Sequence, residues 1–416
     1  MSSQPLLAWF QQFAVPLSGG TAGRDDYDFQ PLADLFATAR VVGLGESTHG
    51  ASEFFRMKHR LIEFLITRFQ FNVVAFEASY SGGTIIDDFV RYGHGDLAAA
   101  LTGQGYTAWD TEEVSALLRW LHDHNSDLSE DRRAGFWGLD SGYNAYGREQ
   151  ILGYLEITAP ELATDIGPTF DALEQLEARW PFLLDDAESD LAAAHLKLRQ
   201  LDQPLARINS STIDPAADRL ARYLRQMMWW TGPDRNTRSR NMGTTLLELI
   251  DTGPPDTKVV VWAHNFHVGR GSDRSGKTLG DLLSERFGQS YVPVSLEFGT
   301  GQCHQRSLDS DLTSGDLVVH EVGSAPVGSL PWCLAATGAP AQAFTLRDRQ
   351  PDPAVDTWFA EPQTEHAIGW TFADWAEFEC VSMIAEKYDA IVYVDTITPN
   401  HPTPNATRAI ARYERY

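Results

Sequence analysis

Short runs of apolar residues, each about the length of one β-strand, alternate along the chain with segments of helical periodicity. An apolar run without polar alternation is typical of a strand buried on both faces, as in a parallel sheet covered by helices. We therefore predict an α/β fold with a mostly parallel central sheet flanked by helices. The predicted strands are residues 40–45, 72–76, 135–139, 258–262, 291–298 and 388–394, and the predicted helices around them are 52–69, 83–92, 112–122, 143–155 and 279–287.

The segment 160–253 differs from the rest, because it lacks strand-like runs and is rich in Ala, Leu, Glu, Gln and Arg with helical periodicity. A chain of 416 residues is long enough for several domains, or for one large domain with an insertion. We predict an N-terminal part of the α/β core at 1–159 and a C-terminal part at 254–416. Between them we predict an all-helical insertion that roofs the active-site cleft.

Bulky apolar side chains gather at the end of this helical segment, among them Met228 and Trp229. One interpretation is the core of a helix bundle. The other is the lining of an apolar cavity, which makes Met228 and Trp229 candidate substrate-binding residues. Trp109 is a further candidate for contact with an apolar substrate.

The chain is strongly acidic, with 57 acidic against 33 basic residues and a formal net charge of −24. Such a chain repels the phosphates of nucleic acids and anionic lipid surfaces. We therefore expect neither nucleic acid nor a membrane as a partner. An apolar small molecule, neutral or cationic, is the partner that this charge favours.

The chain has 3 cysteines, Cys303, Cys333 and Cys380, whose number and spacing fit neither a disulfide framework nor a zinc site. No apolar run approaches the roughly 18–20 residues that a membrane-spanning helix needs. These features predict a cytoplasmic protein.

The loop 43–50, with the sequence GLGESTHG, follows the first predicted strand. Ligands of open parallel sheets bind beyond the carboxyl ends of the strands, so this loop has a favourable position. It holds Glu46 and His49 close enough for a carboxylate to orient an imidazole. Because an imidazole titrates near neutral pH, His49 is a candidate general base for activating water.

Two further strands end in residues of the same kind. Glu77 follows the strand 72–76, and His264 and His267 follow the strand 258–262. Because parallel strands end at one edge of the sheet, we expect these side chains to converge with Glu46 and His49. The convergence, and no single motif, predicts an acid–base site.

Other catalytic signatures do not occur in the sequence. It has no G-x-S-x-G elbow, no HExxH and no Walker A motif. Gly43 and Gly45 resemble part of a dinucleotide fingerprint, but Thr48 occupies the third glycine position. A Rossmann-type cofactor site is therefore disfavoured, and we expect no cofactor.

Four segments together resemble the erythromycin esterase-like family: GLGESTHG at 43–50, VVAFEAS at 73–79, WAHNFH at 262–267 and YDAIVYVDTITP at 388–399. The resemblance extends over nearly the whole chain in order and spacing. It implies hydrolytic opening of a macrolide lactone such as erythromycin, without a required metal, which would confer resistance by inactivating the antibiotic.

The resemblance also implies roles for individual residues. It makes His49 the water-activating base, supported by Glu46 and Glu77. It places His264 and His267 near the carbonyl or the leaving oxygen of the substrate.

Two positions depart from the family pattern. Lys58 stands where some members carry an active-site Arg, and it is a candidate for substrate binding. At 238–242, which is similar to an RDxxM pattern, Ser239 occupies the Asp position.

Three alternatives to a metal-independent ester hydrolase remain. A metal-dependent hydrolase is the first, because histidines and carboxylates that converge are also metal ligands. A biosynthetic tailoring enzyme that uses the same base on another small molecule is the second. The third is a non-catalytic protein that binds an apolar ligand.

Overall fold

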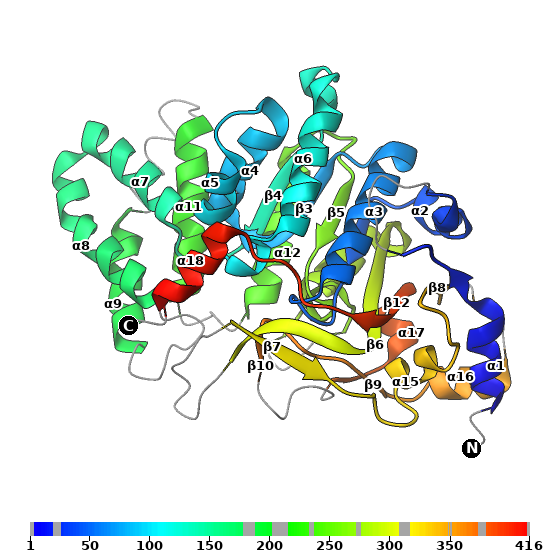
Figure 1. Ribbon diagram of the computed structural model, residues 1–416. Helices are drawn as coiled ribbons and strands as arrows, with labels where there is room; N and C mark the ends of the chain where they lie inside the picture. The colour runs from blue at the N-terminus through cyan, green and yellow to red at the C-terminus, as the bar shows by residue number, and fades with distance from the viewer. Residues whose placement is uncertain are drawn as a thin grey trace.

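The computed structural model describes residues 4–19, 26–177, 188–201, 215–232, 237–271, 276–307, 317–347, 349, 352–372 and 380–413 (Figure 1). In these residues a ten-stranded sheet has the order β1-β8-β12-β6-β2-β5-β3-β4, with β7 and β10 paired to β6. Its strands are β1 (Val15–Pro16), β2 (Val41–Leu44), β3 (Val73–Ser79), β4 (Gly135–Asp140), β5 (Val259–Trp262), β6 (Tyr291–Ser307), β7 (Leu317–Val322), β8 (Ala341–Thr345), β10 (Thr371–Phe372) and β12 (Ala390–Ile397). A separate pair consists of β9 (Gln363–Glu365) and β11 (Cys380–Ser382).

Every neighbouring pair from β12 to β4 is parallel, which confirms the predicted sheet. Strand β8 pairs antiparallel with β12, and β1 pairs antiparallel with β8. The prediction did not include this antiparallel edge. The strand β2 lies between β5 and β6, with Val42 in the core on one face of the sheet and Val41 in the core on the other. Burial on both faces explains why its sequence has no polar alternation.

Helices cover both faces of the sheet (Figure 1). Helices α3, α4 and α6 share one hydrophobic core with the sheet, and α12 and α14 share the other. The helices are α1 (Gln4–Phe13), α2 (Ala33–Ala37), α3 (Ser52–Phe69), α4 (Tyr80–Tyr92), α5 (Leu97–Gly103), α6 (Glu112–Ser126), α7 (Ala145–Thr158), α8 (Pro160–Glu177), α9 (Glu188–Leu198), α11 (Pro215–Thr231), α12 (Arg238–Thr252), α13 (Asn265–Val268), α14 (Leu279–Phe287), α15 (Leu330–Ala335), α16 (Pro353–Phe359), α17 (Ile384–Lys387) and α18 (Pro404–Tyr413). Short 3-10 helices are η1 (Tyr27–Leu32), η2 (Thr107–Trp109), η3 (Glu130–Arg132), η5 (Arg199–Leu201) and η7 (Gly288–Ser290).

Between β4 and β5 the described residues contain helices and no strand. Helices α7, α8, α9 and α11 pack around a hydrophobic core of their own, and Figure 1 shows α7, α8 and α9 at one end of the molecule. Helix α12 packs against the sheet instead. By this packing α7 belongs with α8, α9 and α11, which we call the helical unit, and α12 belongs with the α/β core. The predicted domain boundaries at 160 and 253 stay a prediction.

Strand β6 extends well beyond the predicted residues 291–298, because it continues to Ser307 and pairs there with β7. The sequence of residues 299–365 is rich in Gly, Pro, Ser and Asp and gives no clear strand signal. Among the described residues, none of the helices is both long and apolar enough to traverse a lipid bilayer.

The turn after β2 needs a glycine because two segments approach its backbone closely. The carbonyl oxygen of Gly50 accepts hydrogen bonds from the backbone N–H of His304 at 3.0 Å and of Asn400 at 2.9 Å. A Cβ atom on Gly50 would lie 1.8 Å from the carbonyl oxygen of His304. A side chain here would therefore force β6 away from the loop that carries His49.

We predict that Gly50→Ala lowers stability by at least about 1–3 kcal/mol, because the added methyl group meets backbone rather than a movable side chain. Thermal unfolding followed by circular dichroism measures the effect. Gly153→Ala in α7 is the matched control, since a Cβ on Gly153 has no neighbour within 4 Å. That change should leave the melting temperature unchanged or raise it slightly. Equal melting temperatures for the two variants would contradict the prediction.

Candidate active site

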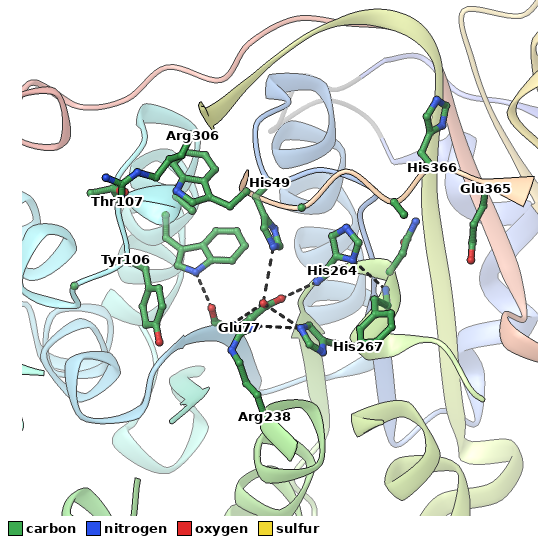
Figure 2. Close-up of a pocket in the computed structure, with 18 of the residues that line it drawn as sticks. His49, Glu77, Tyr106, Thr107, Arg238, His264, His267, Arg306, Glu365 and His366 are labelled. Atoms are coloured by element: carbon green, nitrogen blue, oxygen red, sulfur yellow. Dashed lines mark hydrogen bonds and ion pairs between the residues drawn. The ribbon is translucent and has the colours of Figure 1, made fainter. Parts of the chain in front are cut away.

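A cavity of about 440 Å³ lies at the carboxyl ends of β2, β5 and β3 (Figure 2). Four of the five predicted catalytic residues line it: His49, Glu77, His264 and His267. The expected convergence of side chains from three separate strand ends is therefore present. Glu46 lies behind His49 and is fully buried.

Glu46 fixes the orientation of His49. Its Oε1 lies 2.7 Å from His49 Nδ1, and its Oε2 lies 3.0 Å from the ammonium of Lys58. The indole N–H of Trp262 donates to the same Oε1 at 3.3 Å. Because a carboxylate accepts, the proton of neutral His49 is at Nδ1. Its Nε2 is then a basic lone pair, and Glu77 Oε1 lies 3.9 Å from it.

Lys58 forms an ion pair with Glu46 beneath the cavity and is not part of the lining. Its side chain is fully buried, donates to the carbonyl oxygen of Ala263 at 3.2 Å and lies 4.8 Å from the centre of the Trp262 ring. Burial lowers the pKa of Lys58 to about 8, although the charge of Glu46 opposes this shift. The structure thus places Lys58 beside Glu46 rather than at the surface that a substrate would contact.

Glu77 connects four parts of the site. Its Oε1 accepts from Arg238 Nη2 at 2.8 Å, and its Oε2 accepts from the backbone N–H of His264 at 2.9 Å. The indole of Trp109 donates to the Glu77 carbonyl oxygen at 2.7 Å. Burial favours a raised pKa, but the electrostatic interactions with His267 and Arg238 outweigh it and hold the pKa of Glu77 well below its usual value. Glu77 is therefore an ionised acceptor and not an acid.

A register shift explains the direction of Glu77. The prediction placed this residue after its strand, whereas it lies within β3, where the pairing with β4 shifts between Phe76 and Ser79. Such bulges occur beside active sites, where they redirect a side chain.

Arg238 and Asp140 complete the cluster and were not predicted as site residues. Arg238 begins α12, and its Nε donates to the two Asp140 oxygens at 3.0 and 2.9 Å. Asp140 is the last residue of β4, and Glu77 follows the apolar residues at the start of β3. A polar residue at the point where an apolar run stops therefore identifies Asp140 as it identified Glu77. The resemblance of residues 238–242 to a family pattern singled out Ser239 and not Arg238. Ser239 lies outside the lining and accepts from the backbone N–H of Leu279 at 3.0 Å.

His264 is held in one neutral form. The backbone N–H of Phe266 donates to its Nδ1 at 3.2 Å, so the proton is at Nε2. Burial, with a contribution from the neighbouring imidazole of His49, lowers the pKa of His264 well below its usual value. Its Nε2 makes no close hydrogen bond within the described part of the chain, although the Ser47 backbone also interacts with the ring, and the ring centre is 5.3 Å from that of His49. His264 therefore holds an N–H beside the base that makes no close hydrogen bond.

His267 has two competing contacts. Its Nε2 lies 3.2 Å from Glu77 Oε1 and 3.2 Å from Arg238 Nη1. Because arginine only donates, one nitrogen cannot form both hydrogen bonds. Neutral His267 with its proton at Nδ1 accepts from Arg238, and His267 with a proton at Nε2 donates to Glu77.

The candidates for substrate contact have different positions. Trp109 lines the cavity, and its ring centre is 5.0 Å from that of His49. Met228 and Trp229 are absent from the lining, in contrast to the cavity interpretation. Met228 packs against the core of the helical unit, and the partly buried Trp229 lies under the guanidinium of Arg225 at 5.1 Å.

The carboxylates of the cluster are already paired with cations of the chain. Lys58 binds Glu46, and Arg238 binds Glu77 and Asp140. A divalent cation would have to displace these cations to reach the oxygens. Across the described residues, no group of three His, Cys, Asp or Glu side chains is arranged to hold a metal ion.

The charges around the cavity are mixed rather than acidic. The lining includes three acidic side chains and three basic ones, namely Glu77, Glu177, Glu365, Arg238, Arg306 and Lys387. The excess negative charge of the whole chain is therefore not concentrated at this site. Arg306 and Glu365 in the wall come from residues 299–365, which are rich in Gly, Pro, Ser and Asp and lack clear helix or strand signals.

The fold and the cluster together define an α/β protein with a candidate acid–base site at the ends of its parallel strands. The sequence model of the Erythromycin esterase family matches residues 66–397, so the chain belongs to this family. Membership suggests a hydrolase. Glu46 and His49 precede the matched residues, and their assignment rests on the geometry of the cavity.

Individual relatives are distant. The protein YbfO of Bacillus subtilis (strain 168), a hydrolase by name, is 23% identical over 429 residues, covering 94% of this chain and 91% of that protein. A crystal structure of a Bacillus cereus protein has a TM-score of 0.78 at 20% identity and covers 97% of this chain and 99% of its own. A mutant of the erythromycin esterase EreC in its open conformation has a TM-score of 0.67 at 17% identity, covering 90% and 95%. At these identities the structures establish a shared fold.

We predict that Lys58→Met lowers the free energy of unfolding by about 3–5 kcal/mol, because it leaves the buried carboxylate of Glu46 without its cation. The double variant Glu46→Gln/Lys58→Met, which has no unpaired charge, should recover much of this loss. Urea unfolding measures both. Lys197→Met is the control, since Lys197 pairs with Asp165 at 3.1 Å with both side chains exposed, and it should cost less than about 1 kcal/mol. If the double variant is as unstable as Lys58→Met, the pairing does not account for the burial of Lys58.

Proposed function

We propose that the protein is a carboxylic ester hydrolase that opens a macrolide lactone with a water molecule activated by His49. The observation that supports this most directly is the Glu46–His49 pair. Glu46 holds the proton of the imidazole at Nδ1 and leaves Nε2 as a base at the cavity. General-base catalysis of this kind typically contributes about 10²–10⁴-fold.

The attacking water has a natural position between His49 and Glu77. The 3.9 Å between His49 Nε2 and Glu77 Oε1 is too long for a direct hydrogen bond, and a water molecule can contact both atoms. As the water oxygen forms its bond with the ester carbonyl carbon, His49 Nε2 takes one water proton. Glu46 stabilises the imidazolium that results.

His264 supplies the hydrogen bond that the tetrahedral intermediate needs. Its Nε2–H makes no close hydrogen bond in the described residues, and its neutral state keeps that donor fixed. A single donor to a developing oxyanion is typically worth about 10²–10³-fold. When the ester C–O bond breaks, the proton held on His49 passes to the leaving alkoxide. The products are a carboxylic acid and an alcohol, with one water added.

Arg238 and His267 support this chemistry through Glu77. Arg238 joins Glu77 to Asp140 and is close to His267, so the carboxylate that faces the water keeps one orientation. The positive charge of Arg238 also offsets the negative charge that builds up in the cavity during the attack.

The macrolide class is supported by the family and by the lining. The family bears the name of erythromycin esterase, and rings of Trp109, Phe266 and Trp370 contribute to the cavity walls. Opening the lactone would inactivate such an antibiotic and confer resistance. Because acidic and basic side chains balance at the cavity, an apolar and uncharged substrate fits it at least as well as a cationic one.

Two of the three alternatives fit the geometry less well, and the third differs in its product. A metal-dependent reaction would have to compete with the cations that Glu46, Glu77 and Asp140 already bind. A tailoring enzyme that eliminates or cyclises could use the same base, and its product would lack the added water. A protein that only binds a ligand has no need for an imidazole oriented by a buried carboxylate.

We predict that His49→Asn lowers hydrolysis of erythromycin by about 10²–10⁴-fold while the protein remains folded, because Asn cannot take a proton from water. Mass spectrometry detects the reaction as the gain of one water. The exposed His94 provides the control, and His94→Asn should retain wild-type turnover. Near wild-type turnover by the His49 variant would refute the role of the base.

We predict that His264→Asn lowers kcat by about 10²–10³-fold without moving the acidic limb of the pH–rate profile between pH 6 and 8. The pKa of His264 lies well below its usual value, so the residue stays neutral throughout this range and its loss removes no titration. Initial rates across that range give the profile. A shifted limb would mean that His264 itself gains or loses a proton during catalysis.

A further inference from the structure

One acidic side chain of the cavity lining, Glu177, takes no part in the proposed chemistry. It belongs to α8, and among the described residues of the lining it alone comes from the helical unit. The other two lining acids, Glu77 and Glu365, each form an ion pair with a basic side chain. Glu177 makes no hydrogen bond or close ion pair in the described part of the chain, and its side chain is partly exposed. Its carboxyl group is therefore accessible to a ligand.

Aromatic rings lie around the carboxyl group of Glu177. Besides the main cavity, Glu177 lines a smaller hollow of about 20 Å³ together with Tyr106, Tyr143 and Trp230. Tyr106 is part of both linings. The charge of Glu177 acts on the hydroxyl groups of Tyr106 and Tyr143, which indicates that its carboxyl group lies near both. A carboxyl group and aromatic surface thus occur together at one end of the cavity.

The ring of Tyr106 is held in place by its hydroxyl group. This group interacts with Asp140, whereas the rest of the side chain is partly exposed. Figure 2 shows Tyr106 on one side of Glu77 and His264 on the other. A substrate whose ester carbonyl lies at His49 can therefore place another of its groups against Tyr106.

Negative charge exceeds positive charge at this end of the cavity. Asp140 is buried behind the lining and shares the guanidinium of Arg238 with Glu77. The charge of Arg306 also acts on Glu177. Three carboxyl groups, of Glu77, Asp140 and Glu177, thus lie near two guanidinium groups. The balance of charges over the whole lining does not extend to this part of it, where a cation is attracted.

We propose that Glu177 and Tyr106 form a subsite for a cationic alkylammonium group of the substrate, such as a protonated tertiary amine. The face of an aromatic ring and a carboxylate both attract such a cation, and alkylammonium groups are recognised in this way. An anion would be repelled by Glu177. The proposal concerns one group of a substrate that is otherwise apolar. It rests on the proposed function, because it names a substrate group that the same cavity recognises.

The test compares erythromycin, which carries a tertiary amine, with its N-demethylated and N-acetylated derivative, which has no positive charge. Mass spectrometry gives kcat/KM for the hydrolysis of each lactone, and the ratio of the cationic to the neutral lactone is the readout. Glu177→Gln keeps the size of the side chain and removes its charge. We expect this variant to lower the ratio about 5-fold or more at pH 7.5, because opposite charges attract strongly where little water separates them.

The pH dependence of the same ratio is a second readout. Burial raises the pKa of Glu177 to about 7, although the charge of Arg306 opposes this shift. The carboxyl group therefore loses its proton as the pH rises from 6 to 8. In the wild type the ratio should rise over this range, and in Glu177→Gln it should stay constant. Titration of His49 changes both rates equally and cancels in the ratio.

The other groups near Glu177 do not produce the same pH dependence. Burial raises the pKa values of Tyr106 and Tyr143, so both stay neutral between pH 6 and 8. The guanidinium groups stay charged throughout this range. Glu174, on the same helix, is exposed and forms an ion pair with Arg148 at 3.0 Å.

Two further variants make the result specific. Glu161→Gln is the matched control, because Glu161 is an exposed residue in the first turn of the same helix and lies outside the lining. It should leave the ratio unchanged. Glu177→Lys reverses the charge and should lower the ratio below that of Glu177→Gln. An unchanged ratio in folded Glu177→Gln overturns the proposal. If thermal melting shows that this variant is unfolded, the wild type decides, and a ratio that does not rise with pH overturns the proposal.

A binding measurement separates this proposal from the proposed function. If the wild type hydrolyses neither lactone, the proposed function fails, and calorimetric titration with the same two lactones then decides about the subsite. Tighter binding of the cationic lactone by the wild type, lost in Glu177→Gln, supports the subsite. Absence of binding, or equal binding of the two lactones, overturns it.

Discussion

The buried carboxylate of Glu77 is the constraint that holds the site together. An ionised carboxyl away from water is tolerated only when hydrogen bonds and opposite charges surround it. Here the partners come from the turn after β5 through the His264 N–H, and from the start of α12 through Arg238. The sheet order β2-β5-β3 brings the first partner beside Glu77, and the packing of α12 against β4 brings the second. Any displacement of these elements would leave a charge unpaired.

The side-chain and backbone amides of Asn265 fix the backbone segments around the site in a similar way. Its side chain donates to the Leu296 carbonyl oxygen at 3.1 Å and accepts from the Leu296 N–H at 3.2 Å, while its own N–H donates to the Glu46 carbonyl oxygen at 2.8 Å. One residue thus joins the turns after β2 and β5 to the strand β6. Because His264 and His267 flank Asn265, their positions relative to His49 follow from this bonding. The acid–base geometry is therefore a property of the sheet and not of one mobile loop.

Much of this site was predictable from the sequence, because strand ends are visible as places where an apolar run stops at a polar residue. That rule found His49, Glu77, His264 and His267, and it applies equally to Asp140. Arg238 was missed because it is the first residue of a helix far along the chain, and its role depends on the tertiary packing of α12. The insertion of β5 between β2 and β3, which brings Glu77 to the His264 N–H, is not encoded in any local pattern.

The charge of the substrate is the property that composition predicts least well. A net charge of −24 acts at long range, where salt screens it within about 10 Å. A ligand inside the cavity responds instead to Arg238, Arg306 and Lys387 and to the acids opposite them, which lie within contact range. At such distances, and with little water between, individual pairs outweigh the average field of the chain. Recognition inside such a cavity therefore depends more on the placement of individual donors and acceptors than on the net charge of the chain.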